Sequence, residues 1–179
     1  MTYSNLNGFE ILHRTGDIVY AVPNSSDNID ELNIDVDVNK GFSYFHNRFA
    51  TPYSFFLKTT IDSGYKVIVA VLHPNILVGF ARFEESKSNH CYLLRSIEVN
   101  LSFRQKGIGK LLLAIAFKYL GTHVVAKPDN KRAQNFFKKL GFIDIKTFPD
   151  FGNKKYSGYL ILPCHKSVNL LWSLAQKYP

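Results

Sequence analysis

The residues with the clearest chemical meaning form a short loop with two glycines, Arg104-Gln105-Lys106-Gly107-Ile108-Gly109-Lys110. A β-like run precedes this loop, and an amphipathic helical pattern follows it. The first N–H groups of a helix lack intrahelical acceptors and lie at the positive end of the helix dipole. Glycine lets a ligand approach the backbone closely, and the Arg and Lys side chains add positive charge. The loop therefore suits a pyrophosphate.

Two better-known phosphate loops fit this segment poorly. An ATP-binding P-loop requires Ser or Thr after Gly-Lys and a glycine five positions before the second glycine. Here Leu111 follows Lys110, and Arg104 stands five positions before Gly109. A dinucleotide-binding turn requires a third glycine, where this chain has Leu112, and it lies in the first strand–helix turn of its fold. The spacing rejects the ATP loop and gives little support to the dinucleotide fold.

Two spaced motifs resemble instead the GNAT family of N-acetyltransferases. The segment from Arg104 to Gly109 matches the family signature Q/R-x-x-G-x-G/A at every defined position. A second block is similar to the family's helix-to-strand pattern N-x-x-A-x-x-F-Y-x-x-L-G-F, and it consists of Asn130, Ala133 and the run Phe136-Phe137-Lys138-Lys139-Leu140-Gly141-Phe142. By the order of elements the resemblance extends over residues 67–162, whereas residues 1–60 match no motif of the family.

The resemblance implies a mixed α/β fold with a central, mostly antiparallel twisted sheet flanked by helices. A parallel strand pair would splay apart at the acetyl-coenzyme A (acetyl-CoA) site. It also implies transfer of an acetyl group from acetyl-CoA to a primary amine, without a metal. Carried over by position, it places the backbone of Ile97 and Val99 beside the pantetheine arm, and Asn130 and Phe137 near the thioester. Around the pyrophosphate it places Arg104, Gln105, Lys106, Gly107, Ile108, Gly109 and Lys110.

Catalytic residues are harder to assign than the cofactor site. The attacking amine must be neutral, so a base has to remove a proton, and the leaving thiolate needs a proton donor. The resemblance puts Phe137 where many family members have the donor tyrosine. It puts Leu93, Arg95 and Val125 where various members have a base. Glu98 is the carboxylate nearest to the expected reaction centre. Strand alternation with Ile97 and Val99, however, predicts that its side chain points to the opposite face of the sheet.

Other titratable side chains are weaker catalytic candidates. The bases to consider are Glu84, Glu85, His90 and Ser96. Tyr156 or Tyr159, in a segment that we expect to be a strand, is a candidate proton donor, although tyrosines in strands are usually packing residues. Since the usual acid and base are missing, two functions stay open. The chain is either an N-acetyltransferase with an unidentified acceptor or a non-catalytic acyl-CoA sensor or interaction module.

The net charge of +8 favours anionic ligands but identifies none. The cations in and just before the second motif block form either a solvated helix face or the contact surface for an anionic macromolecule. These cations are Lys127, Lys131, Arg132, Lys138 and Lys139.

Hydrophobic periodicity predicts the elements that must position these residues. The expected strands cover residues 9–22, as a first strand or a hairpin, then 66–72, 76–83, 91–99, 123–126, 142–146 and 156–163. The expected helices cover residues 51–62, 107–119 and 130–140, with Thr51 as N-cap and Pro52 as first helical residue of the first of them. A last helix is predicted from a stripe of Val168, Leu171, Trp172 and Ala175. Residues 23–41 fit either a short helix with loops or a partly mobile lid.

Length and composition limit the number of domains and the classes of protein that fit the chain. The 179 residues suit one domain, 1–179, and the longest apolar runs fall far short of the roughly 20 residues that cross a bilayer. Cys91 and Cys164 have no metal-ligand spacing and suggest no disulfide framework. We therefore expect a cytoplasmic protein without an export signal or a membrane partner. The oligomeric state stays open, with a homodimer as one option, and so does the acceptor, whose pocket would come from residues 23–64.

Overall fold

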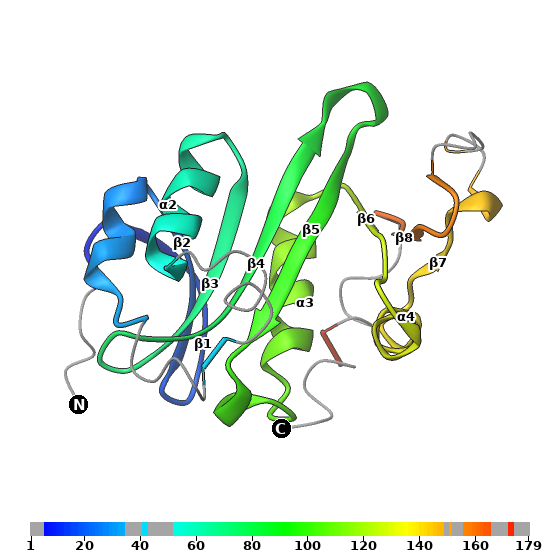
Figure 1. The fold of residues 1–179 in the computed structure, drawn as a ribbon. Helices are drawn as coiled ribbons and strands as arrows, with labels where there is room; N and C mark the ends of the chain where they lie inside the picture. The colour runs from blue at the N-terminus through cyan, green and yellow to red at the C-terminus, as the bar shows by residue number, and fades with distance from the viewer. Residues whose placement is uncertain are drawn as a thin grey trace.

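The computed structural model describes residues 6–34, 41–42, 52–148, 151, 156–165 and 172–173. Within these residues the chain forms one eight-stranded sheet in the order β1-β2-β3-β4-β5-β6-β8-β7, with helices on both faces (Figure 1). The strands are β1 (Phe9–Thr15), β2 (Ile18–Pro23), β3 (Lys66–Leu72), β4 (Ile76–Ser86), β5 (Cys91–Val99), β6 (His123–Ala126), β7 (Ile143–Asp144) and β8 (Leu160–Leu162). The helices are α2 (Tyr53–Asp62), α3 (Ile108–Leu120) and α4 (Lys131–Lys139), and the 3-10 turns are η1 (Ser26–Glu31), η2 (Lys87–Asn89), η3 (Leu101–Phe103) and η4 (Ile145–Thr147).

One parallel strand pair interrupts an otherwise antiparallel sheet. Strands β5 and β6 run parallel, with paired residues from Cys91↔His123 to Leu94↔Ala126. Beyond Leu94, β5 continues to Val99, whereas β6 ends at Ala126. The far end of β5 therefore leaves its parallel neighbour, as the predicted splayed pair requires. This topology confirms the predicted fold class.

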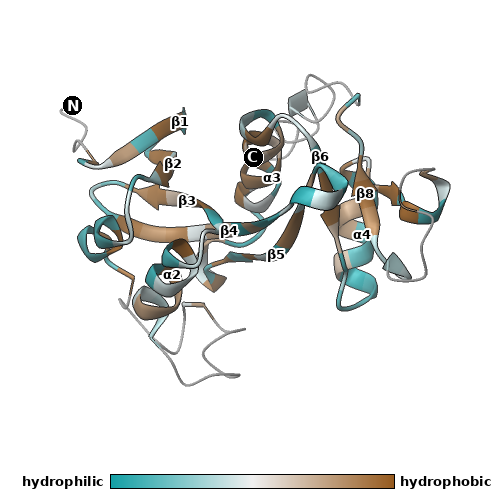
Figure 2. Cartoon of the chain, turned by 90° about the horizontal axis from the view of Figure 1, so that it is seen from above, coloured by the Kyte–Doolittle hydropathy of each residue, from teal (hydrophilic) through white to brown (hydrophobic). Residues whose placement is uncertain are grey.

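The two faces of the sheet carry separate hydrophobic layers. Helix α3 packs on one face and is apolar nearly all round, with Ile108 and every residue from Leu111 to Phe117 buried. Helix α2 packs on the other face, as Figure 2 shows from above. Gly79 of β4 allows α3 to lie close, because a Cβ there would stand 3.2 Å from side-chain atoms of Ile108 and Leu112. The start of α3 therefore packs against β4 at Gly79, which pairs with Val99 at the end of β5.

Most predicted elements are confirmed, with small shifts at their ends. The hairpins β1–β2 and β3–β4 form antiparallel pairs. Residues 23–41 include the short helix η1, and within this range residues 35–40 lie outside the described residues. Of the predicted C-terminal stripe, Trp172 is described and helical, whereas Val168, Leu171 and Ala175 lie outside the described residues.

Three predictions about element boundaries were wrong. Pro52 is the N-cap of α2, not its first helical residue, because its carbonyl accepts the N–H of Phe56; Thr51 lies outside the described residues. Strand β7 stops at Asp144, whose side chain accepts the N–H of Lys146 and starts a 3-10 turn. Strand β8 begins only at Leu160, so Tyr156 and Tyr159 precede it.

None of the helices in the described part of the chain is long and apolar enough to span a membrane. Cys91 is buried and Cys164 is exposed, and both are free thiols. Among the residues that the structure describes, no three side chains of the metal-binding types lie together.

Candidate functional site

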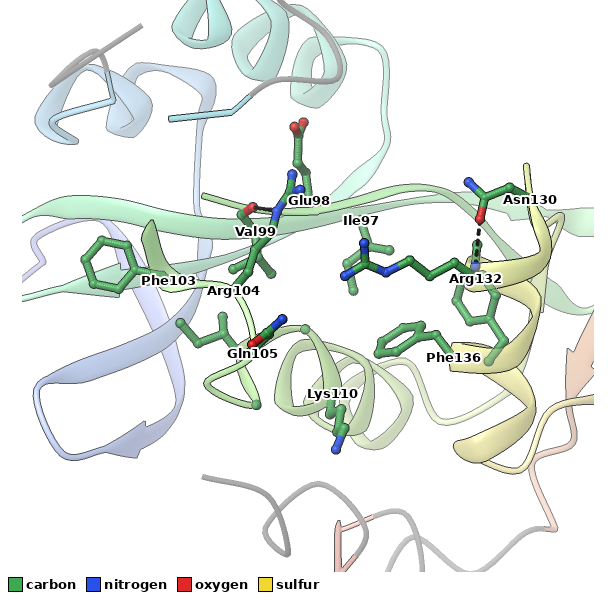
Figure 3. A pocket seen from close by; sticks show the side chains of 15 residues that line it. Ile97, Glu98, Val99, Phe103, Arg104, Gln105, Lys110, Asn130, Arg132 and Phe136 are labelled. Atoms are coloured by element: carbon green, nitrogen blue, oxygen red, sulfur yellow. Dashed lines mark hydrogen bonds between the residues drawn. The ribbon is translucent and has the colours of Figure 1, made fainter. Parts of the chain in front are cut away.

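A pocket of about 620 Å³ lies between the end of β5, the first turn of α3 and the helix α4 (Figure 3). This volume is typical of small-molecule and cofactor sites. All of the residues predicted to bind the cofactor line this pocket except Lys106. The two sequence motifs, which are more than 20 residues apart in the chain, therefore form opposite walls of one cavity.

The loop with two glycines at residues 104–110, called the glycine turn from here on, forms the floor of the pocket. Gln105 and Gly107 both have positive φ, +65° and +78°, and Gly107 is the N-cap of α3. The left-handed region is accessible to glycine at little cost, which explains the residue type at the cap. The carbonyl of Gly107 accepts the N–H groups of Lys110 and Leu111, each at 3.0 Å. The N–H groups of Ile108, whose residue also lines the pocket, and of the neighbouring Gly109 have no helical turn before them and suit an anionic ligand.

The strand wall is built by alternate side chains of β5. The side chains of Ile97 and Val99 point into the pocket. Glu98 is also among the residues that line it, but its carboxylate points away from the cavity, toward the α2 face (Figure 3). The Nε of Arg104 donates to the carbonyl oxygen of Val99 at 3.0 Å. Arg104 is therefore held against the end of β5, and a contact between its guanidinium and a pyrophosphate stays a prediction.

The two lysines of the turn differ in their placement. The Nζ of Lys106 lies 4.9 Å from the centroid of the Phe103 ring, in a cation–π contact, and the side chain does not line the pocket. Lys110 lines the pocket, and its pKa is lowered first by burial and then by the nearby charge of Lys139. A bound anion would stabilise the charged form of a lysine that lies beside another lysine, because the anion reduces their mutual repulsion.

The first turn of α4 forms the third wall. Asn130 is the N-cap of this helix, and its Oδ1 accepts the N–H of Ala133 at 2.9 Å. Phe137 also lines the pocket but is 5% exposed, and its ring packs on the rings of Phe136 and Phe142. Phe137 has no hydroxyl group and so offers no proton where the family pattern has tyrosine.

We expect Asn130→Ala to lower the free energy of unfolding by about 1 kcal/mol, because the N–H of Ala133 loses its cap. Asn130→Asp and Asn130→Ser are the matched controls, since both retain an oxygen that can cap the helix. Urea denaturation of the ligand-free variants measures the effect. Equal stability of the alanine and serine variants would show that the cap contributes nothing.

Glu98 is a buried carboxylate on the α2 face, with 5% of its surface exposed. The Oη of Tyr53, from α2, donates to its Oε2 at 3.0 Å. The Tyr53 ring in turn contacts the rings of Phe42 and Phe80, at centroid distances of 5.0 and 6.1 Å. The carboxylate is therefore held by a helix whose contact with this strand no sequence motif indicated.

The weaker catalytic candidates lie outside the pocket and have other contacts. Glu84 pairs with Arg95, and the Oγ of Ser96 accepts the Nε of Arg82 at 3.0 Å. Glu85 is exposed. Of the tyrosines, Tyr156 accepts a hydrogen bond from the amide of Asn89, and the ring of Tyr159 lies 5.5 Å from the Nζ of Lys127. His90 ends the turn η2 in a left-handed conformation, and its carbonyl accepts the hydroxyl of Thr122.

Sequence reasoning assigned no ligand role to four residues that line the pocket: Phe103, Arg132, Ala133 and Phe136. Arg132 was expected either on a solvated helix face or on a contact surface for an anionic macromolecule. A signal for Arg132 was available, because residues four apart lie on the same side of a helix. Arg132 and Phe136 share that spacing, so the aromatic residue and the cation belong to one wall.

Comparison with known proteins is consistent with this geometry. The sequence profile of the acetyltransferase (GNAT) family matches residues 35–142. Among solved structures, the AtaTR complex bound with AcCoA is 16% identical at a TM-score of 0.60, covering 88% of this chain and 99% of the other. The KacTA–DNA complex is also 16% identical, at a TM-score of 0.59, covering 92% of this chain and 97% of the other. These identities show similarity of fold alone. No curated protein sequence matches the chain.

Proposed function

This chain belongs to the acetyltransferase (GNAT) family, and from that premise we propose that it transfers an acetyl group from acetyl-CoA to a primary amine. The observation that carries the proposal is the pocket between the splayed end of β5 and the glycine turn of α3. Its floor offers backbone N–H groups for a pyrophosphate. Its strand wall offers the edge of β5 beyond Leu94, where β5 no longer pairs with β6, for an extended pantetheine arm. A similar fold has been solved with AcCoA bound, in the AtaTR complex.

In this proposal, the acetyl donor and the acceptor amine bind on opposite faces of β5. The donor would lie on the α3 face, against Ile97 and Val99, and the acceptor would approach from the α2 face, where Tyr53 of α2 donates to Glu98. The neutral amine attacks the thioester carbonyl carbon, the C–S bond breaks, and the thiolate takes up a proton. Glu98 removes the proton that the amine loses. Alignment of the two reactants supplies much of the acceleration, because effective molarities of well-oriented groups are large.

The acceptor amine should itself have a low pKa. Phe137 stands at the position of the usual proton donor, so acid catalysis of thiolate departure is weaker here. An amine that is already partly neutral near pH 7 reduces the demand on the base. This expectation favours amines next to an electron-withdrawing carbonyl group over simple alkylamines such as lysine.

The presence of Phe137 in place of the usual tyrosine also favours a second function. A chain that binds acetyl-CoA without transferring its acetyl group would act as an acyl-CoA sensor or an interaction module. The replacement of the usual tyrosine by Phe137 is the specific observation on its side. The two functions make the same prediction for cofactor binding and opposite predictions for turnover.

The experiment that separates them is calorimetric titration of the purified protein with acetyl-CoA, followed by a thiol-release assay over amines, peptides and aminoacylated RNA. We expect binding, together with release of free coenzyme A for at least one acceptor class. Binding without release across the panel would favour the sensor. Absence of binding would overturn both functions.

A further inference from the structure

The whole positive excess of this chain lies in the segment that builds the pocket. Residues 100–142 contain nine Lys and Arg and a single acid, Asp129, so that their net charge is +8. The remaining 13 Lys and Arg and 13 Asp and Glu cancel, and the chain as a whole has a net charge of +8. This segment includes the glycine turn, α3 and α4. Charge of one sign around a cavity attracts ligands of the opposite sign.

One of these cations reaches into the cavity from the wall opposite the turn. Arg132 is the second residue of α4 and lines the pocket. Figure 3 shows its side chain extending from α4 toward β5. Among the described residues, no carboxylate forms an ion pair with this guanidinium.

The position of Arg132 in its helix is electrostatically unfavourable. The first turn of α4 contains Lys131 and Arg132 and no acidic residue. Cations at a helix N-terminus repel the positive end of the helix dipole, where acidic residues are normally favoured. Two adjacent cations there weaken the ligand-free helix, and a bound anion between the helix and the guanidinium would offset that repulsion.

We propose that Arg132 binds a phosphate group of the acyl-CoA donor, across the pocket from the glycine turn. This inference rests on the proposed function and adds a contact at a position that the second motif leaves undefined. A guanidinium group offers a planar pair of N–H donors that matches phosphate oxygens, and such charge-assisted bonds are strong. The donor has two sources of this chemistry, the pyrophosphate and the 3′-phosphate of its ribose.

The test is calorimetric titration of wild type, Arg132→Gln and Lys131→Gln with coenzyme A and with 3′-dephospho-coenzyme A. Lys131 is the matched control, because it has the same charge in the same helical turn but does not line the pocket. We expect Arg132→Gln to weaken coenzyme A binding about 10- to 100-fold, and Lys131→Gln to weaken it by no more than about threefold. An equal loss with dephospho-coenzyme A assigns the contact to the pyrophosphate, and a loss confined to coenzyme A assigns it to the 3′-phosphate.

Thermal unfolding of the ligand-free variants separates this role from a structural one. Both substitutions remove a cation from the start of α4, so both variants should unfold at the wild-type temperature or slightly above it. Reduced stability of Arg132→Gln alone, or equal affinity of the two variants, would overturn the proposal. Wild-type protein that does not bind coenzyme A would instead overturn the proposed function itself.

Discussion

Gly109→Leu is expected to weaken acetyl-CoA binding by more than about 100-fold and to leave the ligand-free fold intact. A Cβ at position 109 would stand 3.5 Å from the Cγ2 of Val99, 3.8 Å from the Cζ of Phe136 and 4.0 Å from the Cδ1 of Ile97. These are ordinary contact distances, so the backbone accepts a side chain there. The three neighbours all line the pocket. A leucine would therefore occupy the space between the strand wall and α4 that the donor needs.

Gly109→Ala is the matched control for this substitution. A single methyl group meets its neighbours at contact distance and raises the helix propensity of α3 by up to about 1 kcal/mol. We expect the alanine variant to be at least as stable as wild type and to bind acetyl-CoA with an intermediate loss of affinity. Calorimetry gives the affinities, and thermal unfolding shows that both variants fold. Wild-type affinity in a folded Gly109→Leu protein would place the donor elsewhere.

The sequence predicted most of the residues that line the pocket, because each of its signals is local. The helix α3 follows from apolar residues at helical spacing between two glycines, of which Gly121 has the positive φ typical of a helix C-terminus. The direction of Glu98 follows from strand alternation, since its two neighbours face the pocket. In each case the backbone within a few residues decides the outcome.

The contacts that were missed join segments far apart in the chain. Tyr53 and Glu98 meet because α2 packs on the sheet face opposite α3, and no local pattern specifies that pairing. Tyr156 and Tyr159 lie in an aromatic cluster before β8, where tertiary packing overrides the β propensity of the segment. The extent of a single domain over residues 1–179 and the catalytic role of each site residue stay predictions.

Glu98→Gln provides the decisive test of the catalytic half. We expect the variant to bind acetyl-CoA within about threefold of wild type, because its side chain lies on the sheet face opposite the pocket. With an acceptor from the thiol-release panel, its kcat/KM should fall by about 10²- to 10⁴-fold, the usual contribution of a general base. Glu84→Gln is the matched control, since Glu84 is a carboxylate on the neighbouring strand that pairs with Arg95 outside the pocket.

Tyr53→Phe distinguishes a base from a buried structural carboxylate. The Tyr53 hydroxyl donates to Glu98, and a hydrogen bond to a carboxylate favours its charged form. Without that bond the carboxylate holds its proton to higher pH, so the acid limb of the kcat/KM profile should move to higher pH, while activity on the alkaline side changes little. Glu98→Gln should abolish the limb altogether. An acid limb that neither substitution alters would assign the base to another group and leave Glu98 with a packing role.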